Sequence, residues 1–385
     1  MPLVALQGET SQNPALRSEA VKTYRNLYEK LYDFDTLYRA YLEARKNKRY
    51  RDDVLAFTAN LEENLIDIQN HLIYQTYKVG KYKEFFVRDP KKRLIMALPF
   101  RDRVVQWALY NIVNPIFTRS YIDTSYGCVE GRGSIDAIKK LQYWLRLPEN
   151  RKTPCYALKM DITKFFFRIP HDVQLRVLRE KIADERVMWL FDLIINSDAT
   201  PFGFPLEVAD VEFAERLYDV GMPVGNLISQ MLANIVMNKV DQYIKRDLRV
   251  KYYMRYMDDM LVLGHDKQKL HEVKGLVERY LEDNLGLNLN HKTSVRPASC
   301  GIDFVGFRVW NNDIRMRKSS ALRMKHRLRS IREKYGRGTM PLEKCLEVIV
   351  SYLGILKHLS SDNLRDKILE GFVLIRRWPP EDKTE

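Results

Sequence analysis

The sequence predicts an α+β protein in which helical regions flank a central sheet. Apolar residues recur at three- and four-residue spacing over residues 21–77, which is the pattern of amphipathic helices. In the centre of the chain, short apolar runs that are typical of strands alternate with helical patterns, starting at residues 155–160. Residues 318–377 have a helical pattern again, so the expected sheet lies between two helical regions.

The individual elements follow from these periods and from the turn residues between them. Helices are expected at residues 100–118, Ser134–Leu147, Val173–Ile182, Leu227–Leu248 and Lys267–Leu285. Strands are expected at Tyr82–Val87, Arg93–Met96, Cys155–Met160, Lys251–Met257, Met260–Leu263, Phe304–Val309 and Ile314–Met316. The first two strands flank Asp89-Pro90-Lys91-Lys92, which is typical of a hairpin with a basic turn.

The composition favours a nucleic-acid partner. The chain has 385 residues, enough for two or three subdomains, and its 45% of hydrophobic residues indicate a globular protein. Its formal net charge is +14. Such a surplus favours a polyanion, because Lys and Arg release counterions when they contact phosphates. The alternative is a basic protein without such a partner.

The sequence predicts a reduced, cytoplasmic protein without a membrane partner. Cys128, Cys155, Cys300 and Cys345 lie far apart and form no CxxC pair, so neither a zinc site nor a disulfide framework is indicated. The first residues lack the basic start and apolar run of a signal peptide. No stretch approaches the roughly 20 apolar residues that span a bilayer.

The sharpest motif is Tyr256-Met257-Asp258-Asp259, which lies between two apolar strands. Adjacent carboxylates resist joint ionisation, and a divalent cation relieves that repulsion. Hard cations such as magnesium prefer carboxylate oxygens. The motif therefore favours a metal site, and the alternative is an ordinary Asp-Asp hairpin turn.

Asp161 strengthens the case for metal chemistry. It follows the apolar strand at residues 155–160, so a carboxylate stands at a strand end while an acidic pair stands on a distant hairpin. Two cations roughly 3.5–4 Å apart can serve both the attacking and the leaving oxygen of an in-line displacement. The alternative role for Asp161 is a helix N-cap, and both roles can coexist.

Taken together, these motifs resemble the palm of reverse transcriptases. The chain has, in the family's order, Asp161, a Gly-rich segment, Tyr256–Asp259, Asn290-His291-Lys292-Thr293 and Phe304-Val305-Gly306-Phe307. The last two resemble the family's lysine-bearing motif and its primer-gripping hairpin. The resemblance covers roughly residues 40–375, nearly all of the chain.

The resemblance implies the metal and nucleotide sites. Asp161, Asp258 and Asp259 would be catalytic and, with Ile162, would hold two Mg²⁺ ions, for which Mn²⁺ is expected to substitute. The residues that would contact the nucleotide are Arg93, Arg101, Phe166, Val224, Gly225 and Lys292. A bulky Phe166 would clash with a ribose 2′-hydroxyl, and Lys292 would approach the triphosphate. The alternatives are a core phenylalanine, a solvated lysine and a basic surface turn.

The resemblance also implies a grip on the nucleic acid. Tyr256, Met257, Phe304 and Gly306 would contact the primer or template. Residues 314–334 are dense in Arg and Lys, and on a helix Arg323 and Arg327 fall near one face. Such a stripe can follow a phosphate backbone without reading sequence. The alternative is a solvated helix face.

The Gly-rich motif Gly221–Gln230 indicates which kind of reverse transcriptase the chain resembles. Most reverse transcriptases have Gln-Gly where this chain has Val224-Gly225, and intron-type enzymes end the motif in Ser-Pro where this chain has Ser229-Gln230. That pattern resembles diversity-generating retroelements, whose enzymes copy a template RNA with errors at adenines. An apolar Val224 under the templating pair would remove a polar contact that helps fidelity.

The sequence differs from retroelement reverse transcriptases in two places, so a second kind of reverse transcriptase stays an alternative. The segment Phe167–His171 differs from the Pro-Ser-Ile that retroelement enzymes carry, and the connection 197–220 is long, with a helix expected at Phe213–Tyr218. Antiphage-defence reverse transcriptases, which use a dedicated noncoding RNA, have such variations. A further alternative from another class is a catalytically idle RNA-binding scaffold.

The resemblance thus implies a right-hand polymerase fold. The expected parts are a helical N-terminal extension (1–77), fingers (78–150), a palm (151–310) with an insertion (197–220), a helical thumb (311–377) and a disordered tail (378–385). The expected partners are a structured template RNA, a DNA primer or product, deoxynucleotides, and a small basic accessory protein or another protein subunit.

Overall fold

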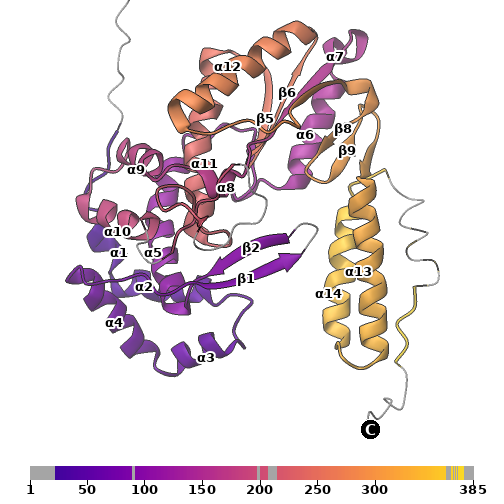
Figure 1. The fold of residues 1–385 in the computed structure, drawn as a ribbon. Helices are drawn as coiled ribbons and strands as arrows, with labels where there is room; N and C mark the ends of the chain where they lie inside the picture. The colour runs from indigo at the N-terminus through magenta and orange to yellow at the C-terminus, as the bar shows by residue number, and fades with distance from the viewer. Residues whose placement is uncertain are drawn as a thin grey trace, which may run out of the picture.

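The computed structural model describes residues 22–88, 92–196, 200–206, 215–360, 366, 368, 370 and 372–376. Helices and strands are mixed along these residues (Figure 1), which confirms the predicted α+β class. The segment 1–20, residues 89–91 of the hairpin turn and the tail 378–385 lie outside the described residues. In the described part of the chain, no helix is long and apolar enough to cross a membrane.

An N-terminal layer of helices packs on one long helix. The layer comprises α1 (Tyr28–Leu31), α2 (Phe34–Ala44), α3 (Asp52–Ala59) and α4 (Leu61–Ile73). The long helix, α5 (Phe100–Thr118), begins and ends where the sequence predicts. The ring of Phe100 meets the rings of Tyr41 and Phe57 with centroids 6.1 and 5.1 Å apart. Such aromatic contacts bury large apolar areas and hold the layer to α5.

The predicted hairpin connects this layer to the centre of the molecule. It consists of β1 (Lys83–Arg88) and β2 (Lys92–Ala97), which pair antiparallel. All of β1 is exposed, whereas β2 buries Leu94 and Met96. In Figure 1 the hairpin extends from the helical body toward the C-terminal helices.

A five-stranded sheet forms the centre, in the order β3-β5-β6-β4-β7. The strands are β3 (Ser125–Tyr126), β4 (Tyr156–Met160), β5 (Tyr252–Tyr256), β6 (Asp259–Gly264) and β7 (Ser294–Pro297). All neighbours are antiparallel except β3 and β5. Successive strand residues point to opposite faces. Leu158 and Met160 therefore join the larger core, while Ala157 joins a second core on the other face.

Helices cover both faces of the sheet. On one side lie α11 (Leu227–Gln242), which continues as a π-helix to Asp247, and α12 (Lys267–Leu285). On the other lies α6 (Ser134–Arg146). The helix α9 (His171–Arg179) starts two residues before the prediction.

The sequence interpretation missed several elements. The short elements that it missed are the helices α7 (Pro148–Lys152) and α8 (Phe165–Arg168) and a three-residue 3₁₀ turn at Ala298–Cys300. The longest one missed is α10 (Glu185–Ile195). Its charged residues Glu185, Arg186 and Asp192 fall on one face and its buried apolar residues on the other, so the helical period was present in the sequence.

Two predicted elements are wrong in the described residues. The run 304–309 is not one strand, because β8 (Ile302–Phe304) and β9 (Phe307–Val309) pair across a turn at Val305-Gly306, both with positive φ. A third strand, β10 (Ile314–Met316), completes this small sheet. Of the helix predicted at 213–218, residues 216–218 are not helical, and Leu217 exchanges backbone hydrogen bonds with Gly203 at 2.9 and 3.0 Å.

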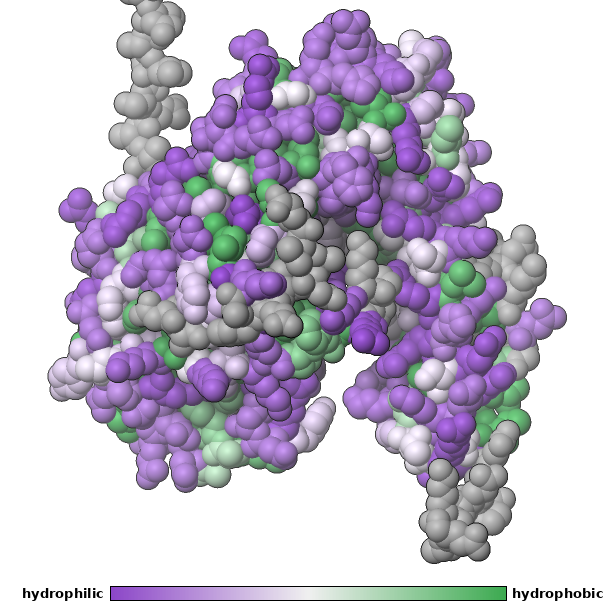
Figure 2. All heavy atoms as spheres, viewed as in Figure 1, coloured by the Kyte–Doolittle hydropathy of each residue, from purple (hydrophilic) through white to green (hydrophobic). Residues whose placement is uncertain are grey.

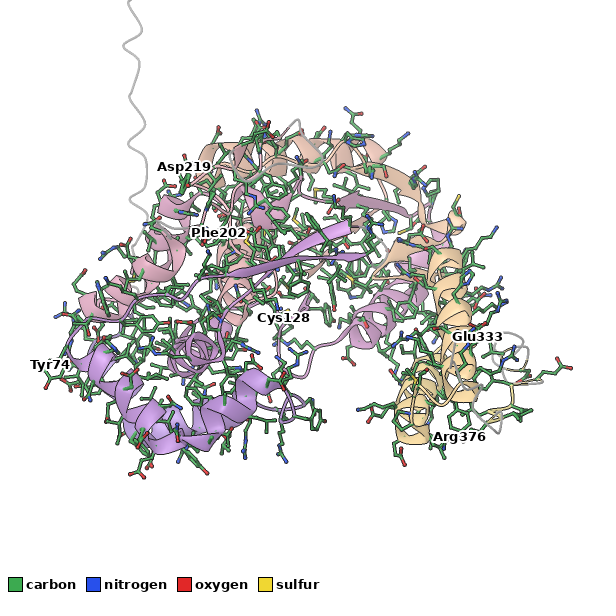
Figure 3. All side chains as sticks on the ribbon, turned by 60° about the horizontal axis from the view of Figure 1, so that its bottom comes forward. Tyr74, Cys128, Phe202, Asp219, Glu333 and Arg376 are labelled. Carbon is green, nitrogen blue, oxygen red and sulfur yellow. The ribbon has the colours of Figure 1, made fainter. Side chains whose placement is uncertain are left out.

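The C-terminal region is a helix pair. It comprises α13 (Lys318–Gly336) and α14 (Leu342–Leu356). Residues 372–376 are not helical, contrary to the prediction, and return along α13, where the Ile375 carbonyl lies beside Gly336. Figure 3 labels Glu333 on α13 and Arg376 on the returning segment. In Figure 2 a notch in the surface separates the pair from the N-terminal layer.

Candidate active site

The acidic pair lies on the tight turn between β5 and β6. Tyr256 pairs with Asp259, so Met257 and Asp258 form a two-residue hairpin loop. Met257 has a φ of 54°. Two-residue hairpin loops use such left-handed conformations to match the twist of their strands. In a non-glycine residue this costs energy and persists only where the surroundings hold it, often at functional sites.

Asp161 reaches the same place from the neighbouring strand. Met160 pairs with Met260, so the next residues, Asp161 and Asp259, lie opposite each other at the ends of β4 and β6. The Asn290 amide donates to the Asp161 carbonyl at 2.7 Å, and the Thr163 amide donates to the Asn288 carbonyl at 2.9 Å. These bonds fix the strand end beside the segment that leads to Lys292.

Burial and neighbouring charge perturb Asp258. Burial, then Asp259 and then Asp161 raise the pKa of Asp258 to about 7. The influence of two carboxylates on the third shows that the three side chains predicted from the sequence are close in space. Like charges this close resist joint ionisation.

The donor set fits a hard divalent cation. Asp161, Asp258 and Asp259 offer carboxylate oxygens, which magnesium prefers. The Asp161 carbonyl points toward Asn290, so that of Ile162, the next residue, points to the other side of the strand, toward β6. In the described part of the chain, no three His, Cys, Asp or Glu side chains are arranged, as they stand, to hold a metal ion.

Lys159 also belongs to the site. It lies two residues before Asp161 on the same face of β4, and its Nζ is 3.1 Å from an Asp259 oxygen. About a third of each of these two side chains is exposed. The Lys159 ammonium group therefore balances part of the negative charge of the three aspartates. The sequence interpretation considered only the aspartates.

A buried ion pair supports the β5–β6 turn. Arg255 and Asp241 have fully buried side chains, with Nη2 of Arg255 2.7 Å from an Asp241 oxygen. Arg255 also donates through Nη1 to the Met257 carbonyl at 2.8 Å and to the Asn234 side-chain oxygen at 3.0 Å. Its Nη2 donates to the Ser125 hydroxyl at 2.8 Å. The guanidinium therefore ties the turn to α11 and β3.

A glycine lies directly against the turn. Gly127 follows β3 and has a φ of 83°, and a Cβ there would lie 3.0 Å from Met257 Cγ and 3.2 Å from the Tyr256 ring. The side-chain amide of Asn234 donates to the Gly127 carbonyl at 3.0 Å. This close approach explains why the position requires glycine.

Most of the predicted nucleotide-contacting residues gather around the Gly-rich motif. The Met96 amide of β2 donates to the Val224 carbonyl at 3.2 Å, and a Cβ on Gly225 would lie 3.1 Å from Ile95. The strand that carries exposed Arg93 thus docks on Val224 and Gly225. The Met222 amide donates to the Phe166 carbonyl at 2.7 Å, which joins Phe166 to the same motif.

The other two predicted nucleotide-contacting residues, Lys292 and Arg101, have different surroundings. Lys292 lines a cavity together with Asp161 and Asp259. Arg101 instead donates to Asp67 of α4 at 3.3 Å, and its guanidinium lies 5.2 Å from the Tyr77 ring centroid. Its phosphate role stays a prediction, since the N-terminal layer engages this side chain.

Of the residues predicted to contact primer or template, Tyr256 and Met257 lie at the β5–β6 turn, and the others lie on the small sheet and on α13. Phe304 is buried, and Val305 and Gly306 form the tip of the β8–β9 hairpin. Val305 has a φ of 41°, a strained conformation for a β-branched residue. On α13, Arg323 and Arg327 are exposed, whereas Met324, Leu328 and Ile331 are buried.

The sequence interpretation missed Lys159, Arg255, Asp241, Asn234 and Gly127. One signal was available: Asp241 lies in a helix whose surrounding residues are largely apolar, and a charge on a buried face is uncommon without a partner. The identity of that partner depends on the meeting of α11 with β5, which no local pattern shows.

Comparison with known proteins agrees with this geometry. Residues 79–309 match the family described as reverse transcriptase (RNA-dependent DNA polymerase). The match covers more than half of the chain, and the chain therefore belongs to the reverse transcriptase family. Membership confirms the right-hand polymerase fold class, and the description of the family names RNA-dependent DNA polymerase activity.

Individual relatives are distant. Protein YkfC of Escherichia coli is 26% identical over 243 residues, which is 54% of this chain and 61% of YkfC. The COX1/OXI3 intron 2 protein of Saccharomyces cerevisiae is 21% identical over 267 residues, 54% of this chain and 29% of that protein. Apo telomerase from Candida tropicalis is 14% identical with a TM-score of 0.46, over 76% of this chain and 61% of that one. The chain thus spans less than two thirds of the length of each.

Proposed function

We propose that this protein copies an RNA template into DNA. The observation that carries the proposal is the meeting of Asp161, Asp258 and Asp259 at the ends of adjacent strands, where burial, followed by the charges of Asp259 and Asp161, raises the pKa of Asp258 to about 7. Family membership supplies the reaction class. The substrates would be deoxynucleotides and a primer annealed to RNA.

Asp161 and Asp258, supported by Asp259 and the Ile162 carbonyl, would hold two magnesium ions. Bound there, the ions would neutralise charge at the attacking and leaving oxygens. The protein's own part is positioning, because aligned reactants remove much of the barrier to an in-line displacement. The bonded turn between β5 and β6 would keep Asp258 in place, and Lys159 would orient Asp259.

The nucleotide would lie on the surface that the hairpin β1–β2 and the Gly-rich motif form together. Arg93 is an exposed guanidinium on β2, and a planar fork suits phosphate oxygens. Phe166, held against Met222, would exclude a ribose 2′-hydroxyl. Lys292 would approach the triphosphate from the side of Asp161. Arg101 would join only after release from Asp67.

We propose four subdomains. Residues 1–77 would form the N-terminal extension, 78–150 the fingers, 151–310 the palm and 311–377 the thumb. The exposed Arg323 and Arg327 would follow a phosphate backbone, while Tyr256, Met257, Phe304 and Gly306 would contact the strands near the reacting end.

We further propose that the enzyme serves a diversity-generating retroelement, with a structured noncoding RNA as template and a small accessory protein as partner. The apolar Val224, held against Met96 of β2, supports this reading, because it offers no side-chain hydrogen bond to the templating pair. A defence system with its own noncoding RNA is the second candidate, favoured by the long connection at 197–220. An idle RNA-binding scaffold is the third.

The experiment is incorporation of deoxynucleotides on a primed RNA template, with and without magnesium. Asp258→Asn is compared with Asp283→Asn, an exposed aspartate on α12 that serves as a matched control. Magnesium-dependent synthesis that is lost only in Asp258→Asn supports the polymerase. Mismatches concentrated at template adenines would favour the retroelement, and uniform fidelity would favour the defence system. If the wild type binds RNA but makes no DNA, the idle RNA-binding scaffold is favoured.

A further inference from the structure

A cavity opens beside the catalytic carboxylates at the edge of the sheet. Its volume is about 350 Å³, and its inner wall includes Asp161, Asp259 and Lys159. It continues along β7 to the small sheet that carries Asp303 and Arg308. A volume of this size lies at the lower end of small-molecule sites.

The strand register explains why its wall is basic. Ala157 pairs with Arg296 and Lys159 pairs with Ser294, so these four side chains share one face of the β4–β7 edge. Lys292 stands at the inner end, where its amide donates to the Asn290 side-chain oxygen at 3.0 Å. Basic side chains thus line the cavity from the catalytic carboxylates outward.

The outer end has more positive than negative charge. Arg308 Nε is 3.2 Å from an Asp303 oxygen, and Arg317 Nε is 4.0 Å from the same oxygen. Two guanidinium groups therefore share one carboxylate. Over the whole cavity the cations are Lys159, Lys292, Arg296, Arg308 and Arg317. The carboxylates are Asp161, Asp259 and Asp303, and the first two would face metal ions.

We propose that this cavity binds inorganic pyrophosphate as it leaves the catalytic site. The inference rests on the proposed function. In the reaction the primer 3′-oxygen forms a bond to the α-phosphorus of a deoxynucleoside triphosphate, and the bond from that phosphorus to the bridging oxygen breaks. The hydroxyl proton passes to solvent, and the bridging oxygen leaves with the β- and γ-phosphates. A small, highly charged anion is therefore produced beside the inner wall at every step.

Pyrophosphate fits the cavity better than a nucleic-acid strand does. Charge-assisted bonds from Lys and Arg suit its compact oxygens. A strand would need an open groove along which phosphates recur, and the exposed stripe of α13 offers that elsewhere. Arg296 and Arg308 stand beyond the catalytic residues, so they would act on the departing anion and not on bond formation.

The test uses the double variant Arg296→Gln/Arg308→Gln. The matched control is Arg315→Gln, which removes an arginine from the same small sheet but outside the cavity. Three quantities are measured on the full chain: calorimetric binding of inorganic pyrophosphate with magnesium, inhibition of incorporation by added pyrophosphate, and the Kd for primed RNA template. Thermal unfolding of each variant checks that it is folded.

The proposal predicts that the double variant binds pyrophosphate about tenfold more weakly and resists inhibition by a similar factor, as for the loss of two partly exposed charge-assisted contacts. Its Kd for primed template and the behaviour of Arg315→Gln should match the wild type. Weaker template binding with unchanged pyrophosphate binding would overturn the proposal in favour of a strand site. No change in either would show that the cavity is not a phosphate site. A wild type that binds pyrophosphate but does not polymerise would refute the proposed function and leave the cavity assignment standing.

Discussion

The buried pair Arg255–Asp241 allows the stability of the fold to be separated from the positioning of the catalytic turn. Both side chains are fully buried. Asp241→Asn would leave the guanidinium with an uncompensated charge, and breaking a buried pair in this way costs about 3–5 kcal/mol. We therefore expect Asp241→Asn to lower the free energy of unfolding by that amount.

A second variant removes both charges. Arg255→Met/Asp241→Leu replaces the pair with apolar side chains, an exchange that is often close to neutral for stability. The Met257 carbonyl would still lack the donor that Arg255 Nη1 provides at 2.8 Å. Displacement of catalytic groups by about 1 Å can reduce a rate about 100-fold. The double variant should therefore regain most of the stability but little of the activity.

The assay combines urea unfolding with single-turnover incorporation on a primed RNA template. Arg255→Lys adds a test of geometry, because an ammonium keeps the charge but cannot reach Asp241, Asn234 and Met257 together. We expect it to be partly stable and poorly active. If the apolar double variant recovers both stability and activity, Arg255 does not position the turn, and the reasoning fails.

The remaining predictions concern the turn, the sugar and the metal site. Asp258→Asn should stabilise the metal-free protein at pH 8 by roughly 2–4 kcal/mol, since each unit by which folding raises an acid's pKa costs about 1.4 kcal/mol once the group is ionised. The pKa of Asp258 is about 7 in the folded protein and near 4 in the unfolded chain, so the stability gained by Asp258→Asn should shrink as pH falls from 7 toward 4. Thermal melts that show the same gain at pH 4.5 would contradict this prediction. Phe166→Ala should raise ribonucleotide use relative to deoxynucleotide use at least about tenfold in kcat/KM, and an unchanged ratio would make Phe166 a core residue only. Gly127→Ala should destabilise the protein by about 1 kcal/mol or more and slow incorporation, because its Cβ would press on Met257, whereas Gly275→Ala, in open space on α12, should be neutral or stabilising; equal effects would refute the close-contact argument.

Much of the fold follows from local patterns in the sequence. The helices α5 and α12 have the predicted bounds, because amphipathic periods and flanking turn residues mark them. The β5–β6 hairpin is confirmed for the same reason. In contrast, the run 304–309 reads as one strand, since nothing local shows that Val305 adopts a positive φ. Residues 216–218 depart from the helix predicted at 213–218, because Leu217 pairs with Gly203.

The acidic residues that meet at the β5–β6 turn could be predicted, whereas the residues that support them could not. Asp161 and Asp258 stand at strand ends in motifs whose chemistry is visible in the residues themselves. Lys159 and Arg255 matter through contacts that exist only after strands and helices pair. Their roles depend on register, since a shift by one residue would turn each side chain to the opposite face.

The most direct test of the central claim is the binding of Mn²⁺ to the full chain in complex with a primed RNA template and a deoxynucleotide, with a primer that lacks its 3′-hydroxyl. Electron paramagnetic resonance would count the bound ions in the wild type, Asp161→Asn and Asp283→Asn. We predict two bound ions in the wild type and the control, and loss of both in Asp161→Asn at the same concentration. Equal Mn²⁺ binding by all three would contradict the claim that these carboxylates form the metal site.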